Sequence, residues 1–212
     1  MASGIILAQY AGSSILADDD GICRGQSATA SAKTLTINGS LTSGGVWTNP
    51  GWGYKVKVVS AGNDTGKTIT VAGKFYASNS VGGYVESIQI ALGNATSVTS
   101  SLYATEITSV VAATITASSI TLGLAADGSA VPVGLNHGAL YQITYGGTFA
   151  GSTAQIKKYH SLTDEWIAVG SAATSAMVEN VHLPAGSAVK CFVTTGSTTS
   201  SLGIMAEQLQ QR

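Results

Sequence analysis

The chain has 212 residues, of which 44% are hydrophobic and only 10% are charged, and its formal net charge is −1. Intrinsic disorder is excluded, because a disordered chain combines high charge with few apolar residues. A protein that binds nucleic acid through a basic surface is disfavoured, because ten Lys and Arg stand against eleven Asp and Glu. The length allows one large β domain or two small ones, each able to bury a core.

Residues 1–30 are the hardest part of the chain to place, and their only cluster of charge is Asp18–Asp20. The first ten residues lack a basic segment and hold an apolar run of only four residues, so we expect no secretory signal. The charge cluster is typical of a solvated turn. For residues 1–30 as a whole we predict an extended N-terminal arm that leaves its own domain and docks on a neighbour.

Beyond this arm, apolar and polar side chains alternate along several short segments. A period of two places one face of a strand on a core and the other in solvent. No segment of twelve or more residues shows the apolar spacing of a helix. The alternating segments are 35–37, 54–58, 68–71, 84–90, 155–157 and 189–193, and turn formers stand at 38–39, 44–45, 63–64, 82–83, 127–128, 146–147 and 184–186. This pattern predicts an all-β fold made of antiparallel β-sandwich, jelly-roll-like or small barrel modules.

A break in the strand pattern divides these modules. The segment 131–138 is rich in turn formers and interrupts the alternation on both sides. We therefore predict two β domains, residues 31–133 and residues 134–212, in addition to the arm.

One stretch has the length of a membrane-spanning helix. About twenty uncharged residues lie between Glu106 and Asp127. Ser and Thr occupy many of these positions, β-branched residues partly alternate with them, and Gly123 interrupts the end. The stretch therefore favours two short strands joined by a polar turn at Ser118–Ser119, and we expect no membrane partner.

The segment from Ala61 to Thr68 satisfies a relaxed phosphate-loop pattern, with Ala in place of the usual first Gly. A phosphate loop requires a helix immediately after it, because the helix N-terminus supplies N–H donors to the phosphate. Residues 68–73 instead have the alternation of a strand. We interpret the segment as a β-hairpin turn that binds no nucleotide.

The residue types that carry catalysis or bind metals are present, but not in the required spacing. No His has a Cys or another His at a short ligand spacing, Asp18–Asp20 lacks the Glu that closes a calcium loop, and no Gly-x-Ser-x-Gly elbow occurs. The cysteines are far apart, and we expect both to be free thiols. The residues concerned are His137, His160, His182, Cys23 and Cys191. We therefore expect no enzyme, no catalytic residues, no metal and no cofactor.

Three aromatic residues, Trp47, Trp52 and Tyr54, cluster in a segment that also contains Gly and Pro. Large rigid rings on such a loop can anchor a subunit interface or form a platform on which sugars stack. The same rings can instead cap the end of the sandwich by packing. We name the three residues as a possible interface, and the other two interpretations stay open.

Long segments of the chain resemble structural proteins of tailed bacteriophages. In the first part these segments are 54–74, 84–90, 102–110, 113–116 and 120–123. In the second part they are 146–149, 154–157, 159–166 and 183–186, which are similar to another virion β module. The resemblance covers roughly residues 35–209. Lys67 and Lys74 depart from it, because uncharged or acidic residues are expected at these positions.

The resemblance implies a non-enzymatic component of a virion, made in the host cytoplasm. A low charge and a surface rich in hydroxyls suit a capsid decoration (cement) protein on the outer face of the shell, and exposed sheet edges favour a symmetric homo-oligomer. We expect a homotrimer bound to the major capsid protein, without nucleic acid. The alternatives are a neck, tail or head-fibre component, and a glycan-binding β module.

Overall fold

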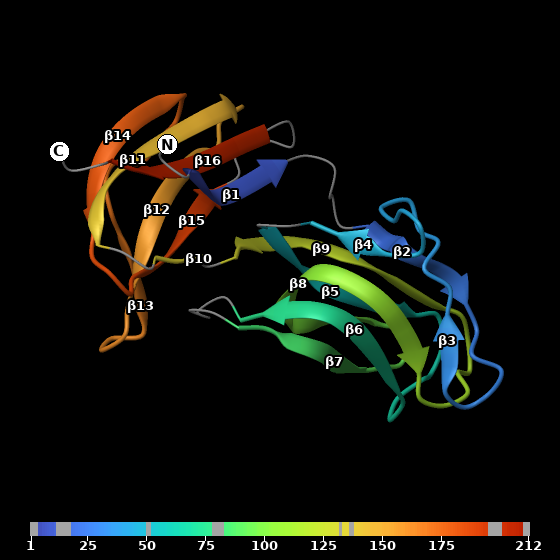
Figure 1. Cartoon of the computed structure of the whole chain (residues 1–212). Coiled ribbons are helices and arrows are strands. Elements are labelled where there is room, and N and C mark those ends of the chain that lie inside the picture. The colour runs from blue at the N-terminus through green and yellow to red at the C-terminus, as the bar shows by residue number, and fades with distance from the viewer. Residues whose placement is uncertain are drawn as a thin grey trace. The chain divides into compact units, whose positions relative to one another are not determined.

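All secondary structure in the described part of the chain is β-strand, in antiparallel sheets, which confirms the predicted fold class. The computed structural model describes residues 4–11, 18–49, 52–77, 83–131, 133–135, 138–194 and 201–209 (Figure 1). The strands are β1 (Gly4–Ala11), β2 (Asp18–Gln26), β3 (Lys33–Leu35), β4 (Trp47–Thr48), β5 (Trp52–Ser60), β6 (Thr68–Tyr76), β7 (Val85–Ala91), β8 (Ser97–Ala112), β9 (Ile120–Ala130), β10 (Val133–Gly134), β11 (Ala139–Thr148), β12 (Thr153–His160), β13 (Glu165–Ala168), β14 (Met177–Leu183), β15 (Ala188–Thr194) and β16 (Ser201–Gln208).

The chain divides into two units. Unit 1 comprises residues 1–14, 79–83 and 129–212, and unit 2 comprises residues 15–78 and 84–128. The boundary at residues 128 and 129 lies close to the predicted boundary between residues 133 and 134. Unit 2 is therefore an insertion between the first and second strands of unit 1, which is a topology that compact domains tolerate at surface connections.

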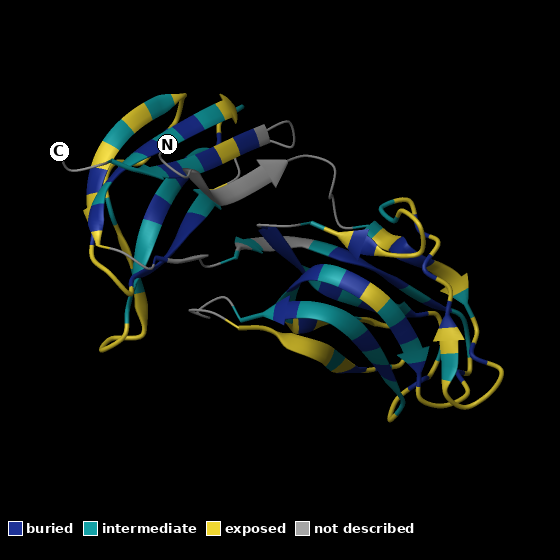
Figure 2. Ribbon diagram, in the orientation of Figure 1, coloured by how far each residue is buried: buried dark blue, intermediate teal, exposed yellow. Residues whose placement is uncertain are grey.

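Unit 1 consists of two four-stranded antiparallel sheets with the orders β1-β16-β11-β14 and β10-β15-β12-β13. Along the chain the eight strands of unit 1 are β1, β10, β11, β12, β13, β14, β15 and β16, which can be numbered 1 to 8. In this numbering the strand order is 1-8-3-6 in the first sheet and 2-7-4-5 in the second. This alternation between sheets is the strand order of a jelly roll. Inward-facing side chains form its core, and they include Tyr141, Ile143, Ile156, Cys191 and Ile204, all at most 2% exposed (Figure 2).

Unit 2 is a sheet with the order β2-β9-β5-β8-β6-β7, and β3 and β4 also pair with β8. The long strand β8 pairs with β5 through residues 97–104 and with β6 through residues 103–112. The two halves of β8 therefore have different neighbours, and the sheet curls around a core that includes Val56, Ile69 and Ile107, each fully buried.

Residues 1–30, for which we predicted an extended arm, contain two strands paired within the chain. β1 pairs with β16 in unit 1, from Gly4 opposite Glu207 to Ala11 opposite Ser201. β2 pairs with β9 in unit 2. The N-terminal strand thus completes a sheet whose other strands all come from the second part of the chain, and docking of these residues on a neighbouring chain stays a prediction.

The strand predictions for the stretch between Glu106 and Asp127 are confirmed, because β8 ends at Ala112 and β9 begins at Ile120. None of the described residues forms a helix that could cross a membrane. Two predicted turns were wrong. Residues 127–128 lie within β9 and residues 146–147 within β11, because glycine can lie within a paired strand as well as end one.

The packing of β2 against β9 depends on a glycine. A Cβ atom at Gly123 in β9 would collide with the backbone carbonyl oxygen of Asp18 in β2. On β16, by contrast, a Cβ atom at Gly203 would meet no atom within 4 Å. Only the first position therefore requires the absence of a side chain.

We predict that Gly123→Ala lowers the free energy of unfolding of unit 2 by about 3 kcal/mol, because the backbone of β2 must move. Gly203→Ala adds the same methyl group in open space and should change stability by less than about 0.5 kcal/mol. Urea denaturation of both variants measures the difference. Equal stability of the two variants would show that β2 does not pack against Gly123.

Candidate functional site

The three predicted interface residues are buried in unit 2. Trp47 lies on β4, Trp52 and Tyr54 lie on β5, and each is only 4% exposed. The rings of Trp47 and Tyr54 form an edge-to-face contact with centroids 6.4 Å apart. As they lie in the structure, these rings present no face to a sugar or to a neighbouring subunit, and their burial supports the interpretation that they pack within the sandwich.

The phosphate-loop-like segment connects β5 to β6 and is followed by a strand, as predicted. It is not a hairpin turn, however, because the order β5-β8-β6 places β8 between the two strands that the segment joins. The hairpin prediction was wrong because the sequence shows that two strands follow one another but not which strands pair.

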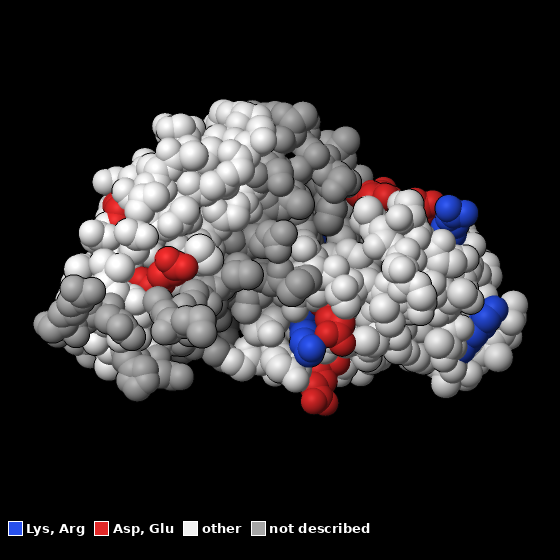
Figure 3. Space-filling view, turned by 45° about the horizontal axis from the view of Figure 1, so that its top comes forward, with Lys and Arg blue, Asp and Glu red and all other residues white. Residues whose placement is uncertain are grey.

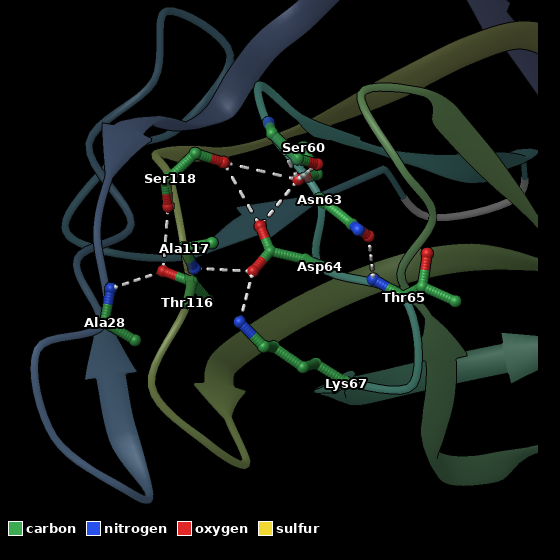
Figure 4. A network of polar contacts seen from close by, with 10 residues as sticks. Ala28, Ser60, Asn63, Asp64, Thr65, Lys67, Thr116, Ala117 and Ser118 are labelled. Atoms are coloured by element: carbon green, nitrogen blue, oxygen red, sulfur yellow. Dashed lines mark hydrogen bonds and ion pairs between the residues drawn. The ribbon is translucent and has the colours of Figure 1, made fainter.

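The carboxylate of Asp64 occupies the centre of this segment and is fully buried (Figure 4). Its Oδ1 accepts hydrogen bonds from Lys67 Nζ at 2.7 Å and from the backbone N–H of Ala117 at 2.6 Å. Its Oδ2 accepts hydrogen bonds from Ser60 Oγ at 2.7 Å and Ser118 Oγ at 3.1 Å. Asp64 therefore ties the β5–β6 connection to the β8–β9 connection.

Burial by itself would raise the pKa of Asp64, but the hydrogen bonds from Lys67, Ser60, Ala117 and Ser118 outweigh it and lower the pKa to about 2. Lys67, the residue that would contact phosphate in a nucleotide site, is held by this carboxylate in an ion pair of 2.7 Å. The network is thus a structural clamp made of a paired, hydrogen-bonded buried charge.

The other residues considered for metal binding or chemistry lie apart. No group of three or more His, Cys, Asp or Glu among the described residues could hold a metal ion. Asp19 pairs with Lys57 at 2.6 Å, and Asp18 accepts a hydrogen bond from Ser40 Oγ at 3.0 Å. His160 Nδ1 contacts Thr163 Oγ1 at 3.0 Å. The remaining histidines are His182, which is exposed on β14, and His137, which lies outside the described residues.

Both cysteines are free, as predicted, and both are buried. Burial raises the pKa of the Cys23 thiol and of the Cys191 thiol to about 12. Because the thiolate is the reactive form, both groups are chemically inert at neutral pH.

The outward face of the β15-β12-β13 sheet in unit 1 carries an aromatic–lysine cluster that we did not predict. Lys157 on β12 stands directly opposite Lys190 on β15. The Lys157 and Lys190 ammonium groups lie 4.2 and 4.5 Å from the centroid of the Phe192 ring, and Lys190 also lies 4.6 Å from the Trp166 ring. Tyr159 stacks at a tilt on Trp166, with centroids 5.4 Å apart. Cation–π contacts offset the repulsion of two like charges on neighbouring strands.

Lys190 is only 1% exposed, and burial, followed by the charge of Lys157, lowers its pKa to about 8. The cluster lies at the base of the β12–β13 hairpin. Sequence reasoning missed it because the cluster depends on the register between β12 and β15, which are far apart in the chain.

The tip of the β12–β13 hairpin presents a bare apolar side chain. Leu162 is 90% exposed (Figure 2). Around it, Tyr159 donates a hydrogen bond to Asp164 Oδ1 at 2.7 Å, and His160 Nδ1 contacts Thr163 Oγ1. These two contacts link β12 to the turn of the hairpin, and the Tyr159–Trp166 ring contact links β12 to β13. Leu162 is thus an apolar side chain exposed at the tip of a cross-linked hairpin.

Charged side chains are sparse on the face shown in Figure 3, where they form a few small groups on an otherwise uncharged surface. Among the described residues, charges that are paired include Lys74 with Glu106 at 2.7 Å. Comparison of the chain with family models, with curated proteins and with solved structures gives no match.

We predict that Asp64→Asn lowers the free energy of unfolding of unit 2 by about 2 kcal/mol at pH 7, the energy that corresponds to the shift of the pKa from 3.8 to about 2. Because the pKa is depressed by folding, this stabilisation is complete above about pH 4 and is lost as the pH falls through about 2. The two proteins should therefore converge in stability toward pH 2.

Urea denaturation in a Trp166→Phe background measures this difference, because the remaining tryptophans, Trp47 and Trp52, report on unit 2 alone. Lys67→Met serves as the control that removes the ion pair but keeps the other three hydrogen bonds, and it should cost less than Asp64→Asn. A difference between Asp64→Asn and the parent that does not vary with pH would contradict the account of the clamp.

Proposed function

We propose that the protein is a non-enzymatic structural component of a bacteriophage virion. In this proposal it is a decoration (cement) protein, made in the host cytoplasm, that binds as a homotrimer to the major capsid protein on the outer face of the shell. The resemblance of residues 35–209 to virion β modules supports the proposal. The jelly-roll order of unit 1 is consistent with it, because viral capsid domains and lectins commonly have this architecture.

The observation that carries the proposal is the β12–β13 hairpin of unit 1. A decoration protein binds many equivalent sites through shape and burial of apolar surface, and most of the energy of such an interface comes from a few side chains that enter pockets. Leu162 stands at the tip of a hairpin whose turn is hydrogen-bonded to β12, and this cross-link reduces the conformational entropy that is lost when Leu162 is buried.

The position on the virion is tested by the copy number. Quantitative gel densitometry of purified virions that carry the protein should give hundreds of copies per particle. A handful of copies would assign the protein to the neck, the tail or a head fibre instead.

We predict that Leu162→Asp weakens binding to undecorated shells at least tenfold, because a charge replaces the apolar side chain that enters the shell. Val178→Asp is the matched control, since Val178 is 56% exposed on β14 of the same unit. It should change the affinity less than twofold. Co-sedimentation with shells measures both variants, and equal binding by the Leu162 variant would exclude the hairpin as the contact.

A further inference from the structure

Strand β7 forms one end of the sheet in unit 2 (Figure 1). Among the described residues it pairs with β6, from Val85 opposite Phe75 to Ala91 opposite Thr68, and its other edge has no strand neighbour. Most of its residues are exposed, as the yellow ribbon in Figure 2 shows. An edge of this kind offers a row of N–H and C=O groups to another strand.

Proteins usually protect an open edge with charged residues, proline or a bulge. The strand at the other end of the same sheet, β2, follows this rule, because it carries Asp18, Asp19, Asp20 and Arg24. In β7 the only charged residue is Glu86, and the strand contains no proline. The two ends of one sheet therefore differ, and β7 has the composition of a strand that pairs with a partner.

A hollow of about 470 Å³ lies beside β7, between this strand and the first half of β8. It lies beside residues 98–102 of β8, which precede the part of this strand that pairs with β6. Its lining includes Ser87 and Gln89 on β7 and Val98 and Leu102 on β8. The hollow gives space to inward-facing side chains of a strand added to β7.

We propose that β7 pairs with β7 of a second copy of this chain, in an antiparallel arrangement centred on Ile88. In this register Ser87 stands opposite Gln89 of the second copy, and the two side chains can form a hydrogen bond across the strands. Glu86 stands opposite Ile90 of the second copy. The inference concerns an interface that the proposed virion function does not require.

We assign the partner strand to a second copy of this chain, because two β7 strands can pair without bringing like charges together. The two Glu86 carboxylates, one in each copy, are four residues apart along the strands, which is about 14 Å. This exceeds the Debye length of about 10 Å at 0.1 M salt, so the single charge of the strand does not oppose the pairing. A two-fold contact uses the same patch on both copies, and a strand centred on an apolar residue meets that condition. Because the contact is two-fold, it would link one trimer to the next.

A cysteine at the two-fold axis tests the register. Directly opposite Cα atoms in antiparallel strands are about 4.5–5.5 Å apart, which lies within the range for a disulfide. Mild oxidation of Ile88→Cys should therefore give a covalent dimer on a non-reducing gel. Val85→Cys is the control, because its counterpart lies six residues away, about 20 Å along the strand. The native Cys23 and Cys191 are buried and should not react.

A pair of lysines tests the contact without a change in the core. Ser87 and Gln89 are exposed, and S87K/Q89K places like charges directly opposite each other twice across the interface. Sedimentation velocity should show at least tenfold weaker association than for the unchanged chain. S43K/T65K adds the same charge at exposed turn positions of unit 2 and should associate normally.

Three results would overturn the proposal. In the first, the unchanged chain does not associate beyond its basic oligomer. In the second, S87K/Q89K and the control S43K/T65K associate equally. In the third, Ile88→Cys and Val85→Cys cross-link equally. The last result would show that β7 does not pair with itself in the proposed register. Ile88 is half-buried, so its substitution can disturb the fold. Circular dichroism of Ile88→Cys therefore checks that the variant is folded.

Discussion

Antiparallel backbone pairing is the constraint on which the rest of the structure depends. The described chain contains no helix, so its buried N–H and C=O groups must find partners on neighbouring strands, in turns or on side chains. This requirement accounts for the role of the N-terminus. Strand β1 completes the sheet of unit 1 by pairing with β16, and without it β16 would be an open edge. The two ends of the chain are therefore joined in one jelly roll, with unit 2 inserted between its first two strands.

Where backbone pairing ends, polar side chains continue it. The connections after β5 and β8 share a backbone hydrogen bond from the N–H of Ala61 to the carbonyl of Ser119, and the Asp64 carboxylate adds two links, to the N–H of Ala117 and to Ser118 Oγ. Thr116 links the β8–β9 connection to the β2–β3 connection, because its Oγ1 accepts a hydrogen bond from the N–H of Ala28 at 2.9 Å and donates one to the carbonyl of Ser118 at 2.8 Å. The segment from Ala61 to Thr68, which has the sequence pattern of a nucleotide site, thus links parts of unit 2 to one another. Lys67 is part of it, through its ion pair with Asp64.

The sequence was sufficient to predict features that depend on local alternation. Strands β5, β6, β7, β12 and β15 follow from the period of two. The burial of Trp52 and Tyr54 could also have been predicted, because they continue the alternation of Val56 and Val58 toward the start of β5 and so lie on the same inward face. The composition of the segment, with its Gly and Pro, favoured a surface loop instead.

Features that depend on register between distant strands could not be predicted. Lys157 and Lys190 meet because β12 pairs with β15, and Ser118 reaches Asp64 across 54 residues of sequence. Pairing partners also decide that residues 61–67 are a connection between strands on either side of β8 and not a hairpin. Side-chain alternation fixes the faces of a strand but not its neighbours.

The central claim is that the protein acts by fitting rigid β surfaces to a shell. The most direct measurement is a cryo-electron microscopy map of intact virions that carry it. The account predicts trimers on the outer face of the capsid, with the tip of the β12–β13 hairpin buried against the major capsid protein. Density at the neck or tail, or a hairpin tip that faces solvent in every copy, would contradict it.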